Sequence, residues 1–153
     1  MKLIALSQGK LTKVDDEDFD ELNEYKWHLA VGGTGHISAG RRKNGKTIFM
    51  HRQITKCPDG LEVDHVNGDS LDNRRKNLRV CTHAENLRNR KVNHSNVSGY
   101  KGVRNNNGQW QAYITFNRKF IHLGNFDNKI EAAKAYNKAS KVYFGEFARM
   151  NKF

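Results

Sequence analysis

Residues 61–90 constrain this chain more than any other segment, because they form one strand, loop, strand and helix pattern. The pattern predicts a first strand at Val63–Val66 and a second strand at Leu78–Cys81, with the polar run NGDSLDNRRKN between them. Thr82 is a strong N-cap candidate, because Glu85 follows three residues later in the capping-box pattern. A short helix is therefore expected directly after the second strand.

The same segment gathers side chains suited to metal-assisted hydrolysis of a phosphodiester. Asp64 and His65 are neighbours, and Asn86 lies just inside the expected helix, near its positive end. A carboxylate and an amide oxygen can hold Mg²⁺, which takes further ligands from water and phosphate, while an imidazole can take a proton from water. Asp64 and His65 alternate along a strand, so they point to opposite faces unless strand twist or the loop reorients them. Basic residues surround the group: Arg74, Arg75, Lys76, Arg79, Arg88, Arg90 and Lys91.

The charge balance points to a nucleic acid as the partner. The chain has 153 residues, with 27 Lys and Arg against 16 Asp and Glu, for a formal net charge of +11. This excess favours a polyanion, and a ribosome-like or merely soluble basic protein is the alternative. Residues 94–153 carry ten basic and three acidic side chains, so the C-terminal third has few groups that repel phosphate.

Cysteine and apolar patterns exclude other classes of protein. Cys57 and Cys81 lie far apart without a CxxC pair, so reduced thiols and no structural zinc are expected. No apolar run approaches membrane length, and the first six residues are too few for a signal peptide. A soluble, cytoplasmic protein without membrane contact is therefore expected.

Residues 1–54 predict short strands around one acidic helix. LIALSQGKLTKV predicts a hairpin that turns at Gln8-Gly9, and the run from Asp15 to Glu24 predicts a helix. KWHLAV, GHISAG and KTIFMH predict three strands, separated by GGTG and by an Asn-Gly turn in RRKNGK. Basic residues beside that turn either grip phosphates or belong to an ordinary solvated turn: Arg41, Arg42 and Lys43.

Segment 48–90 resembles the HNH nucleases, in particular the intron-encoded and phage homing endonucleases, in MHRQI, VDHVNGDSLDNRRKNLRV and AENLRNR. The resemblance implies a ββα-metal fold of the His-Me finger type. It also implies that His65 is the general base, that Asp64 is a metal ligand, and that Asn77 braces the loop and orients the histidine.

Two further positions of the motif carry an implied role. Asn86 stands where many members have the last histidine, and phage homing enzymes of this type use asparagine there as a metal ligand. This choice favours Mg²⁺, with Mn²⁺ as the substitute, over Zn²⁺. His51 in the lead-in MHR either approaches the phosphate or packs structurally. The remaining histidines are expected to be structural or exposed: His28, His36, His83 and His94.

The pattern changes after the polar segment 92–98, which is expected to link two domains. YKGVR, QWQAYITF and FIHLG predict three strands, followed by a helix from about Lys129 to Tyr143, capped by Asn128 and stopped at Gly145. Along the middle strand, apolar residues that would face the helix alternate with residues left for a partner: Gln111, Tyr113 and Thr115.

This part resembles the AP-two domain of plant ethylene-response transcription factors, also found fused to phage HNH endonucleases. The match rests on GYKGVR, Trp110, LG, EAA, AY and FG in order within residues 99–151. It implies a three-stranded sheet on one helix, a core position for Trp110, and a sheet that enters the major groove of double-stranded DNA.

Carried over by position, the resemblance implies DNA contacts from Lys101 and Arg104. Plant members have an acidic residue and an arginine at Tyr113 and Thr115, and an arginine and a tryptophan at Phe120 and His122. Their GC-rich specificity is therefore not transferred. For each residue taken alone, ordinary solvated surface is an equal alternative to a DNA contact. The expected DNA-contact residues are Arg41, Arg42, Arg74, Arg75, Lys101, Arg104, Gln111, Tyr113, Thr115, Arg118, Lys119 and His122.

The sequence thus predicts an α+β protein with a nuclease domain at 1–91, a linker at 92–98 and an AP-two type domain at 99–153. Its predicted function is site-specific cleavage of double-stranded DNA by a monomer of the homing type. The alternative is a sequence-specific DNA-binding regulator with an inactive nuclease fold. An RNA-binding or structural basic protein would leave the Asp-His pair unexplained.

Overall fold

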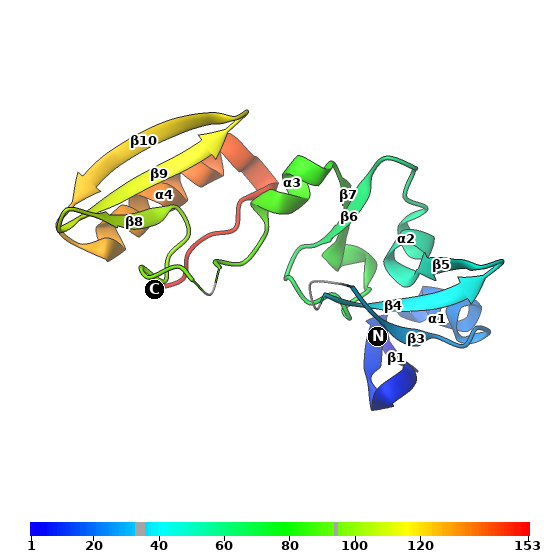
Figure 1. Ribbon diagram of the computed structural model, residues 1–153. Coiled ribbons are helices and arrows are strands. Elements are labelled where there is room, and N and C mark those ends of the chain that lie inside the picture. The colour runs from blue at the N-terminus through cyan, green and yellow to red at the C-terminus, as the bar shows by residue number, and fades with distance from the viewer. Residues whose placement is uncertain (33–35, 94) are drawn as a thin grey trace. The chain divides into compact units, whose positions relative to one another are not determined.

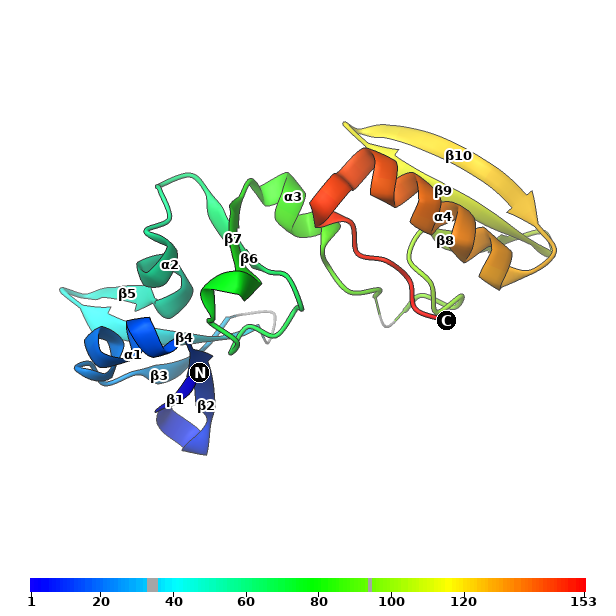
Figure 2. The same ribbon diagram turned by 180° about the vertical axis from the view of Figure 1, so that it is seen from behind.

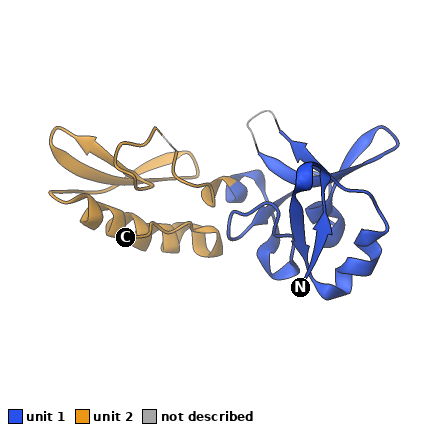
Figure 3. Ribbon diagram, turned by 90° about the horizontal axis from the view of Figure 1, so that it is seen from below, with its two compact units in different colours: residues 1–86 blue, residues 87–153 orange. Residues whose placement is uncertain are grey.

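A computed structural model describes residues 1–32, 36–93 and 95–153, which fall into two compact units. Unit 1 comprises residues 1–86 and unit 2 comprises residues 87–153 (Figure 3). The boundary falls inside a helix, before the segment 92–98 that the sequence predicts as a linker. The assignment of a nuclease and a DNA-binding domain to these units stays a prediction, because compactness alone does not give a function.

Unit 1 consists of short strands and short helices (Figures 1 and 2). In chain order they are β1 (Lys2–Ala5), η1 (Ser7–Gly9), β2 (Leu11–Val14), α1 (Asp16–Asn23), β3 (His28–Val31), β4 (Ile37–Lys43), β5 (Lys46–Phe49), α2 (Met50–Thr55), β6 (Glu62–His65), η2 (Arg75–Asn77), β7 (Leu78–Cys81) and α3 (His83–Arg88), whose last residues belong to unit 2.

Antiparallel pairing joins strands that are neighbours in the sequence. β1 pairs with β2, β4 lies between β3 and β5, and β6 pairs with β7. The first hairpin turns through Gln8 and Gly9, and the β4–β5 turn uses Asn44 and Gly45, all at positive φ. Both turns confirm the sequence prediction. The predicted GGTG connection includes residues 33–35, which lie outside the described residues.

The prediction that KTIFMH is one strand is wrong at its end. The strand β5 stops at Phe49, and Met50 begins the helix α2. Met50 and Ile54 lie one helical turn apart and are both buried in the core of unit 1. The apolar residues of MHRQI are therefore spaced for a helix, and His51 lies on α2 instead of on a strand.

Around α3 the local prediction is confirmed. The backbone amide of Thr82 donates to Glu85 Oε2 at 2.8 Å, and the backbone amide of Glu85 donates to Thr82 Oγ1 at 3.3 Å. This reciprocal capping box starts the helix directly after β7. A core of aliphatic residues and Trp27 supports the unit.

Unit 2 is a three-stranded antiparallel sheet packed against one helix, as predicted. Its elements are β8 (Val103–Asn106), β9 (Gln109–Phe116), β10 (Lys119–Phe126), α4 (Lys129–Phe144) and η3 (Gly145–Phe147). Asn128 Oδ1 accepts from the amide of Ile130 at 2.8 Å, and Gly145 ends the helix at a φ of 55°. Ala132, Ala133 and Tyr136 are buried against the sheet.

Close packing of α4 explains the second glycine of the GYKGVR motif, Gly102. Gly102 has a φ of 71°, and a Cβ there would meet the ring of Tyr136 and stand 2.6 Å from the carbonyl oxygen of Tyr113. A larger residue is therefore excluded both by backbone conformation and by space. Within the described residues, no helix combines the length and apolar character needed to cross a membrane.

Candidate functional site

The sequence-predicted site residues lie on three elements: Asp64 and His65 on β6, Asn77 at the end of η2, and Asn86 on α3. In the β6–β7 register Asp64 pairs with Arg79 and His65 with Leu78. Glu62 and Asp64 are two residues apart on β6, so they share one face of the strand, and His65 belongs to the other. Asp64 and His65 are both buried, with 5% and 7% of their surface exposed.

An arginine holds the Asp64 carboxylate. Arg79 donates to Asp64 Oδ2 from Nε at 2.9 Å and from Nη2 at 2.6 Å, and both side chains are largely buried. A charge-assisted contact of this kind fixes the carboxylate and balances its charge in a poorly solvated place. In the sequence Arg79 stands out only as one member of the basic field. Its register opposite Asp64 follows from the pairing of the two strands.

A chain of hydrogen bonds fixes the imidazole of His65. Its Nε2 lies 3.2 Å from Asn73 Oδ1, Asn73 Nδ2 donates to Thr12 Oγ1 at 2.7 Å, and Thr12 Oγ1 donates to the carbonyl of Leu71 at 2.8 Å. Because the Thr12 hydroxyl proton points to a carbonyl, it accepts from the amide nitrogen, so Asn73 turns its oxygen to His65. His65 Nε2 therefore carries the proton, and Nδ1 is the basic nitrogen of the ring.

Asn77 braces the loop between β6 and β7 through its own contacts. Its Oδ1 accepts from the backbone amide of Asn67 at 3.0 Å, and its Nδ2 donates to the carbonyl of Asp72 at 2.8 Å. His65 Nε2 is hydrogen-bonded to the side chain of Asn73, a residue to which the sequence alone assigns no role. Asn73 is fully buried and contacts Thr12, a residue 61 positions away, so only the folded chain identifies its role.

His51 lies beside the candidate base. Its ring stacks on Phe49 at a centroid distance of 5.5 Å and meets the ring of His65 edge-on at 5.3 Å. Among the described residues, its buried Nδ1 has no hydrogen-bond partner. Burial lowers the pKa of His51 to about 3, with His65 adding to the effect. Of the two alternatives for His51, these contacts favour packing by a neutral ring.

Burial also sets the charge of His65. Desolvation lowers the pKa of His65 below its ordinary value of 6.5, while the hydrogen bond to Asn73 and the nearby Asp64 oppose this shift. The imidazole is therefore neutral at neutral pH, as a general base must be. The exposed His36, to which the sequence assigns no role in the site, lies near enough to contribute to lowering the pKa of both His51 and His65.

Asn86 approaches β6 through Glu62. Asn86 Nδ2 donates to Glu62 Oε2 at 2.6 Å, and His83 Nδ1 lies 2.7 Å from Glu62 Oε1. The hydrogen bond from Asn86 is the main cause that lowers the pKa of Glu62 below its usual range. Among the described residues, no three His, Cys, Asp or Glu side chains gather as a metal site. The oxygen donors near β6 are of the type that a hard divalent ion accepts.

The predicted DNA-contact arginines of unit 1 have protein partners. Arg74 donates to the buried carboxylate of Asp72 at 2.6 and 2.7 Å, and Arg75 donates to that of Asp18 at 2.5 and 2.9 Å. Arg41 donates to Gln53 and lies over the ring of Tyr25, and Arg42 donates to Thr47 at 3.1 Å. Phosphate contact by these four stays a prediction.

On the sheet of unit 2, aromatic and basic side chains gather on the face opposite α4. Tyr113 and Phe120 stack at a centroid distance of 5.2 Å, and the guanidinium of Arg104 lies 5.3 and 5.5 Å from their rings. Gln111 Oε1 accepts from Arg104 Nε at 2.8 Å. Phe120 is 53% exposed and was absent from the predicted contact set. The other predicted side chains of this region are exposed: Thr115, Arg118, Lys119 and His122.

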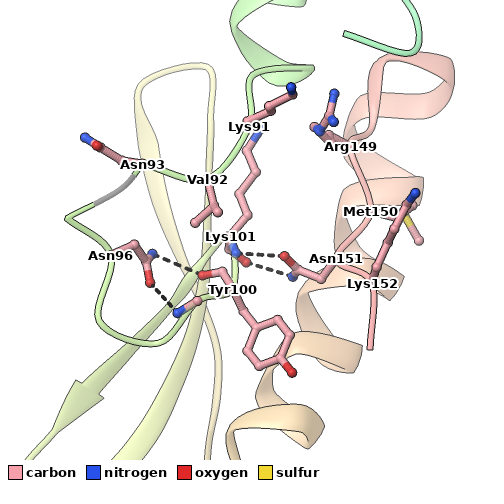
Figure 4. A pocket seen from close by; sticks show the side chains of 11 residues that line it. Lys91, Val92, Asn93, Asn96, Tyr100, Lys101, Arg149, Met150, Asn151 and Lys152 are labelled. Atoms are coloured by element: carbon pink, nitrogen blue, oxygen red, sulfur yellow. Dashed lines mark hydrogen bonds between the residues drawn. The ribbon is translucent and has the colours of Figure 1, made fainter. Parts of the chain in front are cut away.

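Lys101 is directed into its own unit. Its Nζ donates to the carbonyls of Arg88 and Arg90, beside a pocket of about 540 Å³ that Arg149 and Asn151 also line (Figure 4). Burial, with the nearby Arg149 and Arg90, lowers the pKa of Lys101 to about 8. These contacts give Lys101 a structural role, and its predicted contact with DNA remains a prediction.

Comparison with known proteins finds similarity in both halves of the chain. Residues 55–88 match the family model described as HNH endonuclease. An uncharacterized HNH endonuclease of Acanthamoeba polyphaga mimivirus is 28% identical over 151 residues, which cover 98% of this chain and 79% of that protein. Protein 3.8 of Escherichia phage T7 is 31% identical over 94 residues, which cover 60% of this chain and 77% of that protein.

The second kind of relative is a plant protein. An ethylene-responsive transcription factor of Arabidopsis thaliana is 41% identical over 59 residues, which cover 36% of this chain and only 14% of that protein. The HNH match contains the whole of β6, β7 and α3, and with β6 the buried Asp64 and His65.

Proposed function

This chain belongs to the family of phage T7 protein 3.8 and carries an HNH endonuclease domain, and from this premise we propose that it cuts double-stranded DNA at specific sites. The activity is that of a homing-type endonuclease acting as a monomer. Residues 55–88 would hydrolyse the phosphodiester, and unit 2 would select the site. The plant relative, a transcription factor by name, supports the second part only through a short match.

The observation that carries this proposal is the fixed, neutral imidazole of His65. Asn73 holds Nε2–H, so Nδ1 is the nitrogen that takes the proton from an attacking water. The lowered pKa of His65 keeps this nitrogen unprotonated at neutral pH. Asn77 acts indirectly, since it holds the loop that carries Asn73.

Asp64 and Asn86 are the residues that would hold a divalent metal. Their oxygens fit Mg²⁺ or Mn²⁺, and the sequence contains no closely spaced pair of cysteines of the kind that binds structural zinc. When bound, the ion would supply positive charge beside the scissile phosphate. Arg79 fixes the Asp64 carboxylate before any ion arrives, and this contact narrows the positions that its oxygens can take.

In unit 2 the exposed face of β8, β9 and β10 would enter the major groove. A two-stranded β-ribbon fits that groove, where arginine can pair with guanine and an apolar side chain can touch the methyl group of thymine. Arg104 and Phe120 are the side chains of these two kinds on the face. Arg118 and Lys119 at the β9–β10 turn would contact phosphate, together with Thr115 and His122.

The alternative function is a DNA-binding regulator with an inactive nuclease fold. One observation favours it, namely that the Asp64 carboxylate already has a cationic partner in Arg79. A regulator, however, needs neither the buried Asn73 network nor a neutral histidine.

Incubation with DNA and divalent metal separates the two functions. We expect the full chain to cut genomic DNA, which offers many different sequences, into discrete fragments when Mg²⁺ or Mn²⁺ is present. The DNA should stay intact when a chelator removes the metal. His65→Ala protein should bind the same DNA without cutting it. Sequence-specific binding without cleavage by the wild-type protein, with either metal, would establish the regulator instead.

A further inference from the structure

The amide of Asn86 has a partner that can only accept hydrogen bonds. Asn86 Nδ2 lies 2.6 Å from Glu62 Oε2. The second oxygen of the same carboxylate, Oε1, lies 2.7 Å from Nδ1 of His83. Glu62 is therefore held at both oxygens by residues of α3, while its own backbone is part of β6.

This arrangement decides which end of the amide faces outward. An ionised carboxylate accepts and never donates, so the NH₂ end of Asn86 must point to Glu62. The carbonyl oxygen Oδ1 is bonded to the same carbon and consequently points away from Glu62. Without such a partner, an asparagine could present either end. Only the oxygen end can coordinate a hard metal ion.

The face of β6 connects this amide to the other proposed metal ligand. Glu62 and Asp64 are two residues apart on the strand, so their side chains leave it on the same side. Through Glu62, Asn86 is tied to the strand face that carries the Asp64 carboxylate. His83 and Asn86 are three residues apart on α3, on neighbouring positions of the helix surface, so one carboxylate can reach both.

We propose that Glu62 is a positioning residue that sets the Asn86 amide with Oδ1 toward the metal, and that His83 holds Glu62 in place. The inference rests on the proposed function, because it concerns the same metal site. Removal of an outer-shell partner typically costs about 10–100-fold in metal affinity or activity. A residue that merely anchors α3 to β6 would change stability without this selective effect on metal.

The test compares three substitutions at or near Glu62 in the full-length protein. Glu62→Leu removes the acceptor with little change of size, and Glu62→Gln keeps an oxygen that can accept from Asn86. His83→Ala is a mild third variant, because His83 is exposed and its loss should not unfold the protein. Glu85→Gln is the matched control. It removes one carboxylate from α3, the helix that carries Asn86, and leaves Glu62, the hydrogen-bond partner of Asn86, unchanged.

The readout is Mn²⁺ titration without DNA, followed by paramagnetic broadening of the Asn86 side-chain amide signals in the nuclear magnetic resonance spectrum. We expect Glu62→Leu to raise the Mn²⁺ concentration for half-broadening by about 10–100-fold, and Glu62→Gln by no more than about threefold. His83→Ala should fall between them, and Glu85→Gln should match the wild type. The half-saturating Mn²⁺ concentration for DNA cleavage should follow the same order.

Three results would overturn the inference. The first is equal half-broadening in the wild type and Glu62→Leu, and the second is no Mn²⁺ effect on Asn86 in the wild type. A Glu62→Gln variant as impaired as Glu62→Leu would show that Glu62 is itself a charged ligand, which also contradicts a positioning role. If the wild type binds Mn²⁺ at Asn86 but cuts no DNA, the proposed nuclease function fails and the positioning of Asn86 stands.

Discussion

The two units arrange their polar side chains in opposite ways. In unit 1 the candidate catalytic groups are buried and bound to one another, as in the chain from His65 through Asn73 to Thr12. In unit 2 the candidate reading face is the face of β8, β9 and β10 opposite α4. Its apolar side chain Phe120 is 53% exposed, whereas the predicted contact residue Gln111 is buried. Chemistry on a phosphodiester needs groups held in one geometry, whereas reading a base needs groups that can be reached.

The two units also differ in how their positive charge is balanced. Three arginines of unit 1 are paired with carboxylates: Arg74 with Asp72, Arg75 with Asp18 and Arg79 with Asp64. Residues 94–153 have ten basic side chains and three acidic ones, a net charge of +7. We therefore expect rate to depend on unit 1 and the electrostatic part of affinity to depend on unit 2.

The largest expected effect comes from removing the base. His65→Ala should lower the rate of DNA cleavage by about 10²–10⁴-fold, because it removes the group that takes the proton from water. Affinity for DNA should stay within about twofold, since the imidazole is buried and makes no phosphate contact in this proposal. Single-turnover cleavage and a binding titration measure the two quantities. A variant with more than half of the wild-type rate would remove His65 from the mechanism.

Next in size is the loss of the metal ligands. Asp64→Asn should raise the half-saturating Mg²⁺ concentration by more than the roughly 10–100-fold typical of outer-shell changes, because it removes the only charge among the two proposed ligands. Asn86→Ala should have the smaller effect. The asparagine substitution keeps an acceptor for Arg79, whereas alanine would leave a largely buried guanidinium without its carboxylate and destabilise the fold. Unchanged half-saturation in both variants would put the metal elsewhere.

Removal of the sheet and the helix of unit 2 tests the division of roles directly. A chain truncated after residue 93 should remain able to cut, but with weaker and less selective binding. The slope of log affinity against log salt should become flatter by about 0.9 for each phosphate that the truncated chain no longer binds. Binding with an unchanged affinity and salt slope would show that the basic face of unit 2 is ordinary solvated surface.

The structure adds a control to this truncation. Residues 87–91 pack within unit 2, since Arg88 lies 5.2 Å from the rings of Phe116 and Phe144 and its carbonyl accepts from Lys101. Lys101→Met in the full chain removes that hydrogen bond without removing the sheet. It should change thermal stability more than it changes the salt slope.

A smaller effect is expected from single side chains of the reading face. Arg104→Ala and Phe120→Ala should each cost about 1–3 kcal/mol of specific binding and relax preference at one base position. Arg118→Ala should instead weaken binding to all sequences alike. Selection of binding sites from a random DNA library measures the preference. Equal, sequence-independent losses in all three variants would assign the whole face to phosphate.

The smallest expected effect is on pH dependence. A general base acts in its neutral form, and burial lowers the pKa of His65 below 6.5. Cleavage should therefore persist as pH falls through 6.5 and decline only at lower pH, further down than an unperturbed histidine would predict. The acidic limb of the rate against pH under single-turnover conditions measures this. A midpoint at or above 6.5 would show that His65 is not desolvated in the working enzyme.

Local features of this protein could be predicted from its sequence because their causes are local. The turns at Gln8-Gly9 and Asn44-Gly45 follow from backbone preferences, and the helix after Thr82 follows from a capping box within four residues. The three strands and helix of unit 2 follow from alternation and from Asn128 and Gly145. The helix α2 was missed because a run as short as MHRQI fits either period.

The order of the site residues was also readable, but their partners were not. Whether Asn73 or Asn77 holds His65, that Arg79 binds Asp64, and that Glu62 turns the amide of Asn86 are all decided by strand register and by contacts across the fold. Thr12, which fixes Asn73, is 61 residues distant in the chain. The sequence therefore determined which groups are available for chemistry. The tertiary structure decided which nitrogen of His65 is basic and which end of the Asn86 amide faces Glu62, because a hydrogen bond is set by the atoms that meet in space.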